Sequence, residues 1–254
     1  MDDCLIYSGG STPAAEYACS ILRQSGLEIS THPSSQVTHL LLDVPGFRED
    51  GLLRSGAPPE PLLSTQPTDI TICGGKLDQP CLQAYRTWDF LKDEAYLAQN
   101  AYITAECVLD VILPRFSGLL RGCPILVIGW GRIGKCLSRM LQAIGAEVTV
   151  AARNPKDRAM LRALGFGIAG TYISPSALSG FRILINTVPS PILSREQTTF
   201  CREDCLLVEL ASQPGLAGDN IISARGLPGI HRPEASGELI ARTLLDHMNK
   251  EELS

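Results

Sequence analysis

The sequence predicts an α/β protein of two domains, and three observations lead to this prediction. Strand-like and helix-like segments alternate along both halves of the 254-residue chain. A glycine turn at 129–134 follows directly after a short apolar run and leads directly into an amphipathic stretch. Between the halves, apolar residues recur at helical spacing over 85–113, so one or two helices are expected there, ended by Pro114.

The first third of the chain has the pattern of a small α/β unit with a parallel sheet. A helix is expected over 14–25, capped by Ser11 or Thr12 and ended by Gly26. The segment 45–67 is rich in Pro, Gly and Ser and is expected to be a loop. Strand candidates are 5–7, 27–30, 37–44 and 69–73.

The alternation is clearer in the second half. A continuous apolar run at 125–128 indicates a strand buried on both faces. A second strand is expected at 147–152, and two more buried strands at 183–186 and 206–210. Helices are expected at 135–144, 154–164 and 234–248. We therefore expect an N-terminal domain over 1–118, joined by the C-terminal helix 235–254, and a second domain over 119–234.

Composition and charge exclude several classes of protein. A net charge of -5 argues against nucleic acid or an acidic membrane as partner. No apolar run reaches the roughly 18 residues of a membrane span, and the acidic start lacks the basic residues of a signal peptide. The nine cysteines are scattered; Cys201 and Cys205 have no second pair to complete a metal site. We expect reduced thiols, no bound metal and a cytoplasmic location.

The glycine turn predicts a dinucleotide-binding site of the Rossmann type. Gly129 permits the tight turn, Gly131 lets the backbone approach a pyrophosphate, and Gly134 lets the helix pack close to the strand. The phosphates are expected at the N-terminus of the following helix, where N–H groups and the positive end of the helix dipole lie. The predicted cofactor residues of the turn are Gly129, Trp130, Gly131, Arg132, Ile133 and Gly134.

The end of the second strand of this domain indicates which dinucleotide is preferred. Sites that prefer NAD place Asp or Glu about 20 residues after the turn, where it binds the ribose 2′-hydroxyl. Ala152 stands at that position, followed by Arg153 and Asn154. Without a carboxylate to repel a 2′-phosphate, and with a guanidinium to pair with it, NADP is favoured and NAD is the alternative. Alternatively, Arg153 is a solvated loop charge.

Three later loops are small, polar and rigid, as suits the surroundings of a flat nicotinamide ring. They cover 186–190, 211–215 and 226–231, and the first two follow predicted strands directly. Ligands of open α/β sheets bind beyond the carboxyl ends of the strands. The cofactor contacts predicted here are Asn186, Thr187, Val188, Pro189 and Ala211.

Together these motifs resemble those of the A subunit family of dipicolinate synthase. The matching strings are Asn-Thr-Val-Pro-Ser at 186–190, Glu-Leu-Ala-Ser-Gln-Pro-Gly at 209–215 and Gly-Leu-Pro-Gly-Ile at 226–230. Asn100, Thr104 and Glu106 match an upstream Asn-x-x-x-Thr-x-Glu stretch. The resemblance covers 100–248. The Ala-Ser-x-Pro-Gly and Gly-Leu-Pro-Gly strings are not combined in other nicotinamide dehydrogenases.

The resemblance implies two α/β domains like those of the 2-hydroxy-acid dehydrogenases, a C-terminal Rossmann domain and a smaller N-terminal flavodoxin-like domain. It implies an oxidoreductase that oxidises dihydrodipicolinate to dipicolinate with NADP as hydride acceptor, during spore formation. A flavoprotein, the B subunit of dipicolinate synthase, is the implied partner. We also expect a homo-oligomer.

The implied substrate is a small dicarboxylate, which needs cationic or hydrogen-bond-donating partners. Ser212 is expected to donate a hydrogen bond, and Glu106 and His231 are candidate general bases. Alternatively, His231 caps the last helix or lies exposed, and Glu106 makes a capping or interdomain contact. With Ser212, the predicted substrate contacts are Asn100, Thr104, Pro228, Gly229 and Arg232.

Asn100, Thr104 and Glu106 are close enough in sequence to share one face of a helix. Three histidines without evident partners are expected on the surface, and Trp88 and Tyr172 are expected to pack. The histidines are His32, His39 and His247.

Two other functions stay open. One is another NADP-dependent 2-hydroxy-acid or imine oxidoreductase. The other is a cofactor-binding regulatory subunit without catalysis, which the short N-terminal half suggests.

Overall fold

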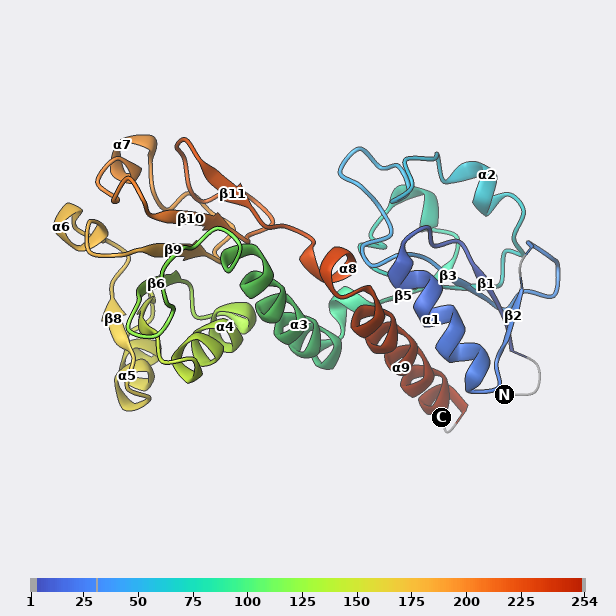
Figure 1. Ribbon diagram of the computed structural model, residues 1–254. Coiled ribbons are helices and arrows are strands. Elements are labelled where there is room, and N and C mark those ends of the chain that lie inside the picture. Colours follow the sequence, from blue (N-terminus) through green and yellow to red (C-terminus); the bar gives the residue numbers. More distant parts are fainter. Residues whose placement is uncertain (1–3, 31, 253–254) are drawn as a thin grey trace. The chain divides into compact units, whose positions relative to one another are not determined.

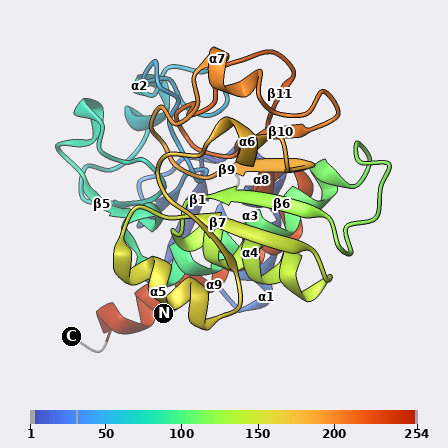
Figure 2. The same cartoon turned by 90° about the vertical axis from the view of Figure 1, so that its left-hand side faces the viewer.

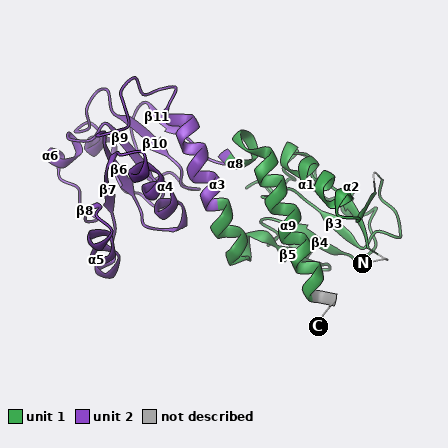
Figure 3. Cartoon of the chain, turned by 60° about the horizontal axis from the view of Figure 1, so that its bottom comes forward, with its two compact units in different colours: residues 1–100, 228–254 green, residues 101–227 purple. Residues whose placement is uncertain are grey.

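The computed structural model describes residues 4–30 and 32–252 (Figure 1). The chain forms two compact units, one of residues 1–100 with 228–254 and one of residues 101–227 (Figure 3). Each unit is an α/β fold around a parallel sheet, which is the predicted fold class. The first boundary lies within helix α3 (Glu94–Ile112), which runs from the first unit into the second.

The first unit has a five-stranded sheet in the order β2-β1-β3-β4-β5. Helix α1 begins as predicted, because the Thr12 side chain caps it by accepting a hydrogen bond from the Ala15 N–H. The elements are β1 (Leu5–Ser8), α1 (Pro13–Gln24), β2 (Glu28–Ser30), β3 (His39–Leu41), α2 (Glu60–Leu63), β4 (Thr71–Gly74), η1 (Pro80–Leu82), β5 (Arg86–Asp89), η2 (Phe90–Lys92), α8 (Leu227–His231) and α9 (Pro233–Glu252).

The C-terminal helix α9 packs along α1 in the first unit. A Cβ at Gly237 would lie 2.5 Å from the Tyr17 Cβ and 2.7 Å from the Ala14 carbonyl oxygen, so the two helices meet at a position that accepts glycine alone. The chain therefore returns to its first unit after completing the second.

The second unit has a six-stranded sheet in the order β11-β10-β9-β6-β7-β8. Figure 2 shows the strands in this order, from β11 and β10 to β6 and β7. The elements are β6 (Pro124–Ile128), α4 (Arg132–Ala143), β7 (Glu147–Ala151), α5 (Pro155–Ala163), β8 (Gly167–Ala169), α6 (Pro175–Leu178), β9 (Ile183–Asn186), α7 (Arg195–Thr198), β10 (Leu206–Glu209) and β11 (Ile221–Ser223).

Both faces of this second sheet are buried, which explains the unbroken apolar run of β6. Ile125 and Val127 of β6 join one core with α3 and α4. Leu126 and Ile128 join a second core, with residues of the loop before α6 and of α6 itself. Successive side chains of a strand point to opposite faces, so a strand covered on both sides must be apolar throughout.

The structure differs from the sequence-based expectations at short elements. The segment 45–67, expected to be a loop, contains the single turn of α2. The segment 85–113, expected to be helical, begins with strand β5 and a turn of 3-10 helix before α3. Strands β8 and β11 are not among the predicted elements. Each of these elements has three or four residues, too few for a hydrophobic period to appear.

Some side chains also differ from expectation. His39 contacts the Thr38 hydroxyl at 2.9 Å, and His247 stacks on Trp88 with ring centroids 3.8 Å apart, so neither is an isolated surface residue. Trp88 packs as predicted, also meeting Phe90 edge-on. Tyr172, expected to pack, is 72% exposed.

Candidate functional site

The glycine turn lies at the point where the strand order of the second unit reverses. Strands β7 and β8 extend the sheet on one side of β6, and β9 to β11 extend it on the other. The turn therefore follows β6 next to the loop that follows β9. Thr187 joins the two: its N–H and its hydroxyl both donate to the Ile128 carbonyl, at 2.9 and 2.8 Å. Ligands of open parallel sheets bind at such a reversal.

The three glycines have separate geometric reasons to be glycine. Gly129 has φ of 108°, and a Cβ there would lie 2.4 Å from the Thr187 hydroxyl. A Cβ at Gly134 would lie 2.2 Å from the Gly129 carbonyl oxygen, so the first turn of α4 packs directly on the glycine turn. A Cβ at Gly131 would meet no atom within 4 Å. The roles predicted for Gly129 and Gly134 match these contacts, and at Gly131 the space is open.

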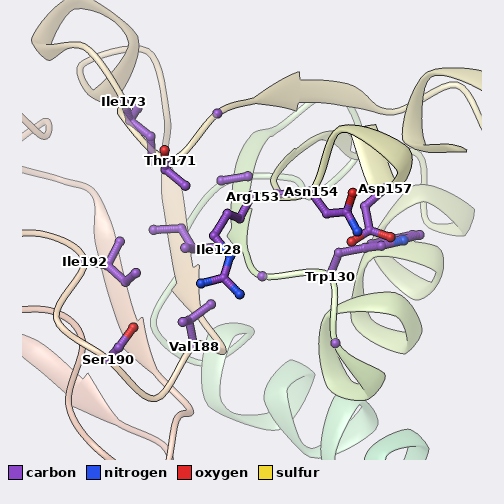
Figure 4. Close-up of a pocket in the computed structure, with 15 residues that line it drawn as sticks. Ile128, Trp130, Arg153, Asn154, Asp157, Thr171, Ile173, Val188, Ser190 and Ile192 are labelled. Carbon is purple, nitrogen blue, oxygen red and sulfur yellow. The ribbon is translucent and has the colours of Figure 1, made fainter. Parts of the chain in front are cut away.

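A cavity of about 440 Å³ borders this open position. Figure 4 shows its walls, formed by the glycine turn, the end of β7, the start of α5 and the loops after β8 and β9. Gly131 caps α4 without a side-chain hydrogen bond, whereas the Asn154 side chain caps α5 by accepting from the Lys156 N–H. The N-terminus of α4 beside the cavity is thus not covered by a capping side chain.

The cavity brings together some of the predicted cofactor residues and adds others. The predicted residues that line it are Gly129, Trp130, Gly131, Arg153, Asn154 and Val188. The lining residues that were not predicted as contacts include Asp157, Gly170, Thr171, Ile173, Ser190 and Ile192. No sequence signal marked Gly170 to Ile173, because they follow the unpredicted strand β8. Ser190 could have been found, since it ends the Asn-Thr-Val-Pro-Ser string.

The charged side chains of the cavity are Arg153 and Asp157. In Figure 4 the Arg153 guanidinium reaches into the cavity near Val188, while Asp157 lies with Asn154 and Trp130. The guanidinium of Arg158 donates to the Ala152 and Arg153 carbonyls at 3.3 and 3.2 Å, which holds the chain at this bend. NADP was expected on the ground that no carboxylate stands here. That ground holds for the end of β7, but the first turn of α5 brings the Asp157 carboxylate to the cavity wall, so the preference between NADP and NAD stays a prediction.

A buried carboxylate holds the two loops that follow β9 and β10. Glu209 is 2% exposed, and its oxygens accept hydrogen bonds from backbone and side-chain donors. These donors are the Ala211 N–H (3.0 Å), the Gly215 N–H (2.8 Å), the Leu216 N–H (3.0 Å) and the Asn186 amide (2.9 Å). Buried carboxylates require such a complete set of donors. Glu209 was not predicted as a site residue, although an acidic residue at the end of an apolar strand was a usable signal.

This arrangement determines what Asn186 and its neighbours do. Asn186 is fully buried, and its amide also donates to the Val188 carbonyl and accepts from the Val188 N–H, both at 3.0 Å. It therefore shapes the loop from within and does not line the cavity, nor do Thr187, Pro189 and Ala211. Arg132, Ile133 and Ser212 also lie outside the lining, and Ser212 is exposed.

Helix α3 separates the three residues that were expected to share one face. Asn100 and Thr104 are four residues apart in a continuous helix and lie on the same side. Glu106 follows Thr104 by two residues, which is a rotation of about 200° around the helix. Glu106 therefore faces elsewhere. Thr104 is buried, and Glu106 is half-buried.

The remaining predicted substrate residues belong to the first unit, with Asn100. Pro228 and Gly229 lie in α8, and His231 ends it. Arg232 is half-buried and donates to the His231 carbonyl at 2.9 Å.

Other chemistry is limited within the residues that the structure describes. They contain no group of three or more His, Cys, Asp and Glu side chains arranged to hold a metal ion. None of their helices has the length and apolarity that crossing a bilayer requires. All nine cysteines are free thiols. Burial raises the pKa of Cys123 and of Cys136, so these thiols are poor nucleophiles.

Comparison with known proteins gives one sequence relative and several structural ones. No family model matches the chain. The A subunit of dipicolinate synthase from Bacillus subtilis (strain 168) is 29% identical over 153 residues, which are 57% of this chain and 52% of that relative. The sequence match thus spans about half of the relative's length.

The fold of this chain matches solved structures over 96–100% of its length. The crystal structure of the dipicolinate synthase A chain from Bacillus subtilis superposes with a TM-score of 0.83 at 21% identity, covering 100% of this chain and 98% of that one. The A subunit from Bacillus halodurans gives 0.83 at 18% identity, covering 96% and 97%. A transhydrogenase from Sinorhizobium meliloti gives 0.75 at 11% identity, covering 97% and 94%.

The resemblance to the dipicolinate synthase A subunit that the motifs predicted is therefore confirmed, and so is the two-domain α/β fold with its Rossmann unit.

Proposed function

We propose that this chain is an NADP-dependent oxidoreductase, similar to the dipicolinate synthase A subunit, which oxidises dihydrodipicolinate to dipicolinate. The cavity beside the glycine turn carries this proposal: it combines an open Gly131, an α4 N-terminus without a side-chain cap and the Arg153 guanidinium. These are the features that a phosphate-bearing dinucleotide requires. The flavoprotein B subunit of dipicolinate synthase is the proposed partner, and spore formation the proposed setting.

The residues present fit a nicotinamide dinucleotide. The backbone at Gly131 is open for a pyrophosphate, and the end of β7 with Arg153 and Asp157 would hold the adenosine ribose. The Glu209 carboxylate holds the 211–216 loop rigid through three backbone N–H groups. A bound nicotinamide would accept the hydride. The protein then has to position the substrate and accept a proton, because forming the aromatic pyridine removes a hydride and a proton together. Glu106 and His231 stay the candidate bases.

The direct test is turnover. Purified protein is mixed with NADP and enzymatically generated dihydrodipicolinate, with and without the flavoprotein partner, and the growth of dipicolinate and NADPH absorbance is followed. We expect equal amounts of the two products. NADPH binding without product, even with the flavoprotein present, would favour a regulatory role. Turnover of a 2-hydroxy acid or an imine instead would assign the chain to another oxidoreductase class.

Replacing Arg153 by alanine tests the cofactor preference. We expect NADPH to bind about 10- to 30-fold more weakly, because a charge-assisted contact with the 2′-phosphate is lost, while NADH binding changes less than about twofold. Asp157→Asn should act in the opposite direction and tighten NADPH, since it removes a like charge. Calorimetric titration of both cofactors measures this. Arg162→Ala, an exposed position on α5 outside the cavity lining, is the control. Equal weakening of both cofactors by Arg153→Ala would contradict the assignment.

A further inference from the structure

The sheet of the first unit has its own reversal of strand order, between β1 and β3. A ligand of this unit is expected beyond the carboxyl ends of the strands near that reversal. The segments that follow β1, β3 and β4 there are residues 9–12, 43–47 and 75–77. They lie tightly together: the Gly75 N–H donates to the Asp43 carbonyl at 3.1 Å, and the Gly46 N–H donates to the Gly75 carbonyl at 2.7 Å.

The N-terminus of α1 could otherwise bind an anion at this edge, but a carboxylate of the protein itself occupies it. Asp43 is 4% exposed, and its carboxylate accepts the N–H and the hydroxyl of Ser11, at 2.9 and 3.0 Å. It also accepts the N–H and the hydroxyl of Thr12, the cap of α1. The protein's own carboxylate thus occupies the place of an external anion. An anionic ligand at this edge needs another partner.

Lys76 is the one basic residue in the three segments. Its backbone has φ of 61°, in the left-handed region. Among the residues that the structure describes, Asn220 (φ 58°) is the only other non-glycine in this region, and asparagine adopts it readily. Lysine gains no such local hydrogen bond, so this conformation is an unfavourable one for it.

The surrounding residues enforce this conformation. The Asp89 carboxylate accepts the Lys76 N–H at 3.2 Å, the Leu77 N–H at 2.8 Å and the Leu91 N–H at 2.9 Å. Before Lys76, a Cβ at Gly75 would lie 2.7 Å from Val44 Cγ1. The turn is therefore built around the position of Lys76, which is half-buried. No hydrogen bond or ion pair of its ammonium is found within the described part of the chain.

We infer that Lys76 is a carboxylate-binding residue of the first unit, whose ammonium pairs with a carboxylate of a small dicarboxylate substrate. The identity of the substrate rests on the proposed function; the choice of Lys76 rests on its imposed backbone conformation and its place at the carboxyl ends of the strands. Glycine would adopt a φ of 61° without cost, but position 76 carries a lysine, a residue with a long cationic side chain. The oxygens of Asp43 and Asp89 accept hydrogen bonds from N–H and hydroxyl groups, and neither carboxylate forms an ion pair with the Lys76 ammonium in the described part of the chain.

The test separates stability from binding at one position. Lys76→Gly should leave the Tm of the full chain unchanged or higher, because glycine relieves the backbone, and should weaken pyridine-2,6-dicarboxylate at least about tenfold in calorimetry. Lys76→Gln should weaken it similarly, and Lys76→Arg should restore most of the affinity. Asn220→Gly is the matched control, with nearly the same φ and no expected effect on binding.

Wild-type affinity in Lys76→Gly would overturn the inference, as would a wild-type chain that binds neither the dicarboxylate nor sulfate. The neutral pyridine-2,6-dicarboxamide should bind equally to wild type and variant; a Lys76-dependent difference with it would also overturn the role in charge pairing. Failure of the proposed function looks different. The chain would then bind dicarboxylate through Lys76 and yet neither bind NADP nor form product.

Discussion

Glu209→Ala is expected to lower the free energy of unfolding of the second unit by at least about 3 kcal/mol. The substitution leaves the N–H groups of Ala211, Gly215 and Leu216 without their acceptor, at about 1–3 kcal/mol for each group that stays unpaired. The Asn186 amide also loses an acceptor and keeps the Val188 carbonyl. Glu209→Gln should be destabilising too, because its amide NH₂ would face N–H donors. Urea unfolding followed by the emission of Trp130, in a Trp88→Phe background, reports on this unit.

The matched control for Glu209 is Glu203, a glutamate of the same unit that is exposed to solvent. Glu203→Ala should change the free energy of unfolding by less than about 0.5 kcal/mol, because an exposed side chain leaves no buried group unpaired when it is removed. If Glu209→Ala unfolds at the same urea concentration as Glu203→Ala, the Glu209 carboxylate does not hold the two loops.

Gly131→Asp is expected to abolish dinucleotide binding, with at least about a 100-fold loss of affinity, while the fold stays intact. The position has φ of -76° and ψ of -169°, which any residue adopts, and a Cβ there meets no atom within 4 Å. Aspartate is also a favourable cap for α4. Its carboxylate would stand where the pyrophosphate is expected, and two like charges about 4 Å apart repel by about 4 kcal/mol at an effective dielectric constant of about 20.

Two variants separate binding from folding in this experiment. Gly131→Ser adds a neutral cap of similar size and should weaken binding far less than Gly131→Asp. Gly134→Ala should instead lower the Tm, because its Cβ would lie 2.2 Å from the Gly129 carbonyl oxygen. Calorimetric titration with NADPH and thermal unfolding measure the two effects. Unchanged NADPH affinity in Gly131→Asp would place the dinucleotide elsewhere on the chain.

Much of the second unit could be predicted because its signals are local. The strand, the glycine turn and the following helix are consecutive in the chain. Gly129 and Gly134 each meet a steric requirement, set by the loop after the adjacent strand β9 and by the turn itself. The start of α5 was predicted for the same reason, since Asn154 caps a helix that Pro155 begins. Edge strands such as β8 could not be predicted. The three residues of β8 form a strand only because they pair with β7, and a run of three residues carries no pattern of its own.

The sequence alone determined the α/β class, the glycine turn and the resemblance to the dipicolinate synthase A subunit, because these depend on residue types at short spacing. The tertiary structure decided which side chains surround the cavity and which hold it in shape. Asp157 reaches the cavity through the first turn of α5, and Glu209 gathers donors from two loops that are far apart in the chain. Such contacts arise when separate strands align in one sheet, so no local pattern of the chain records them.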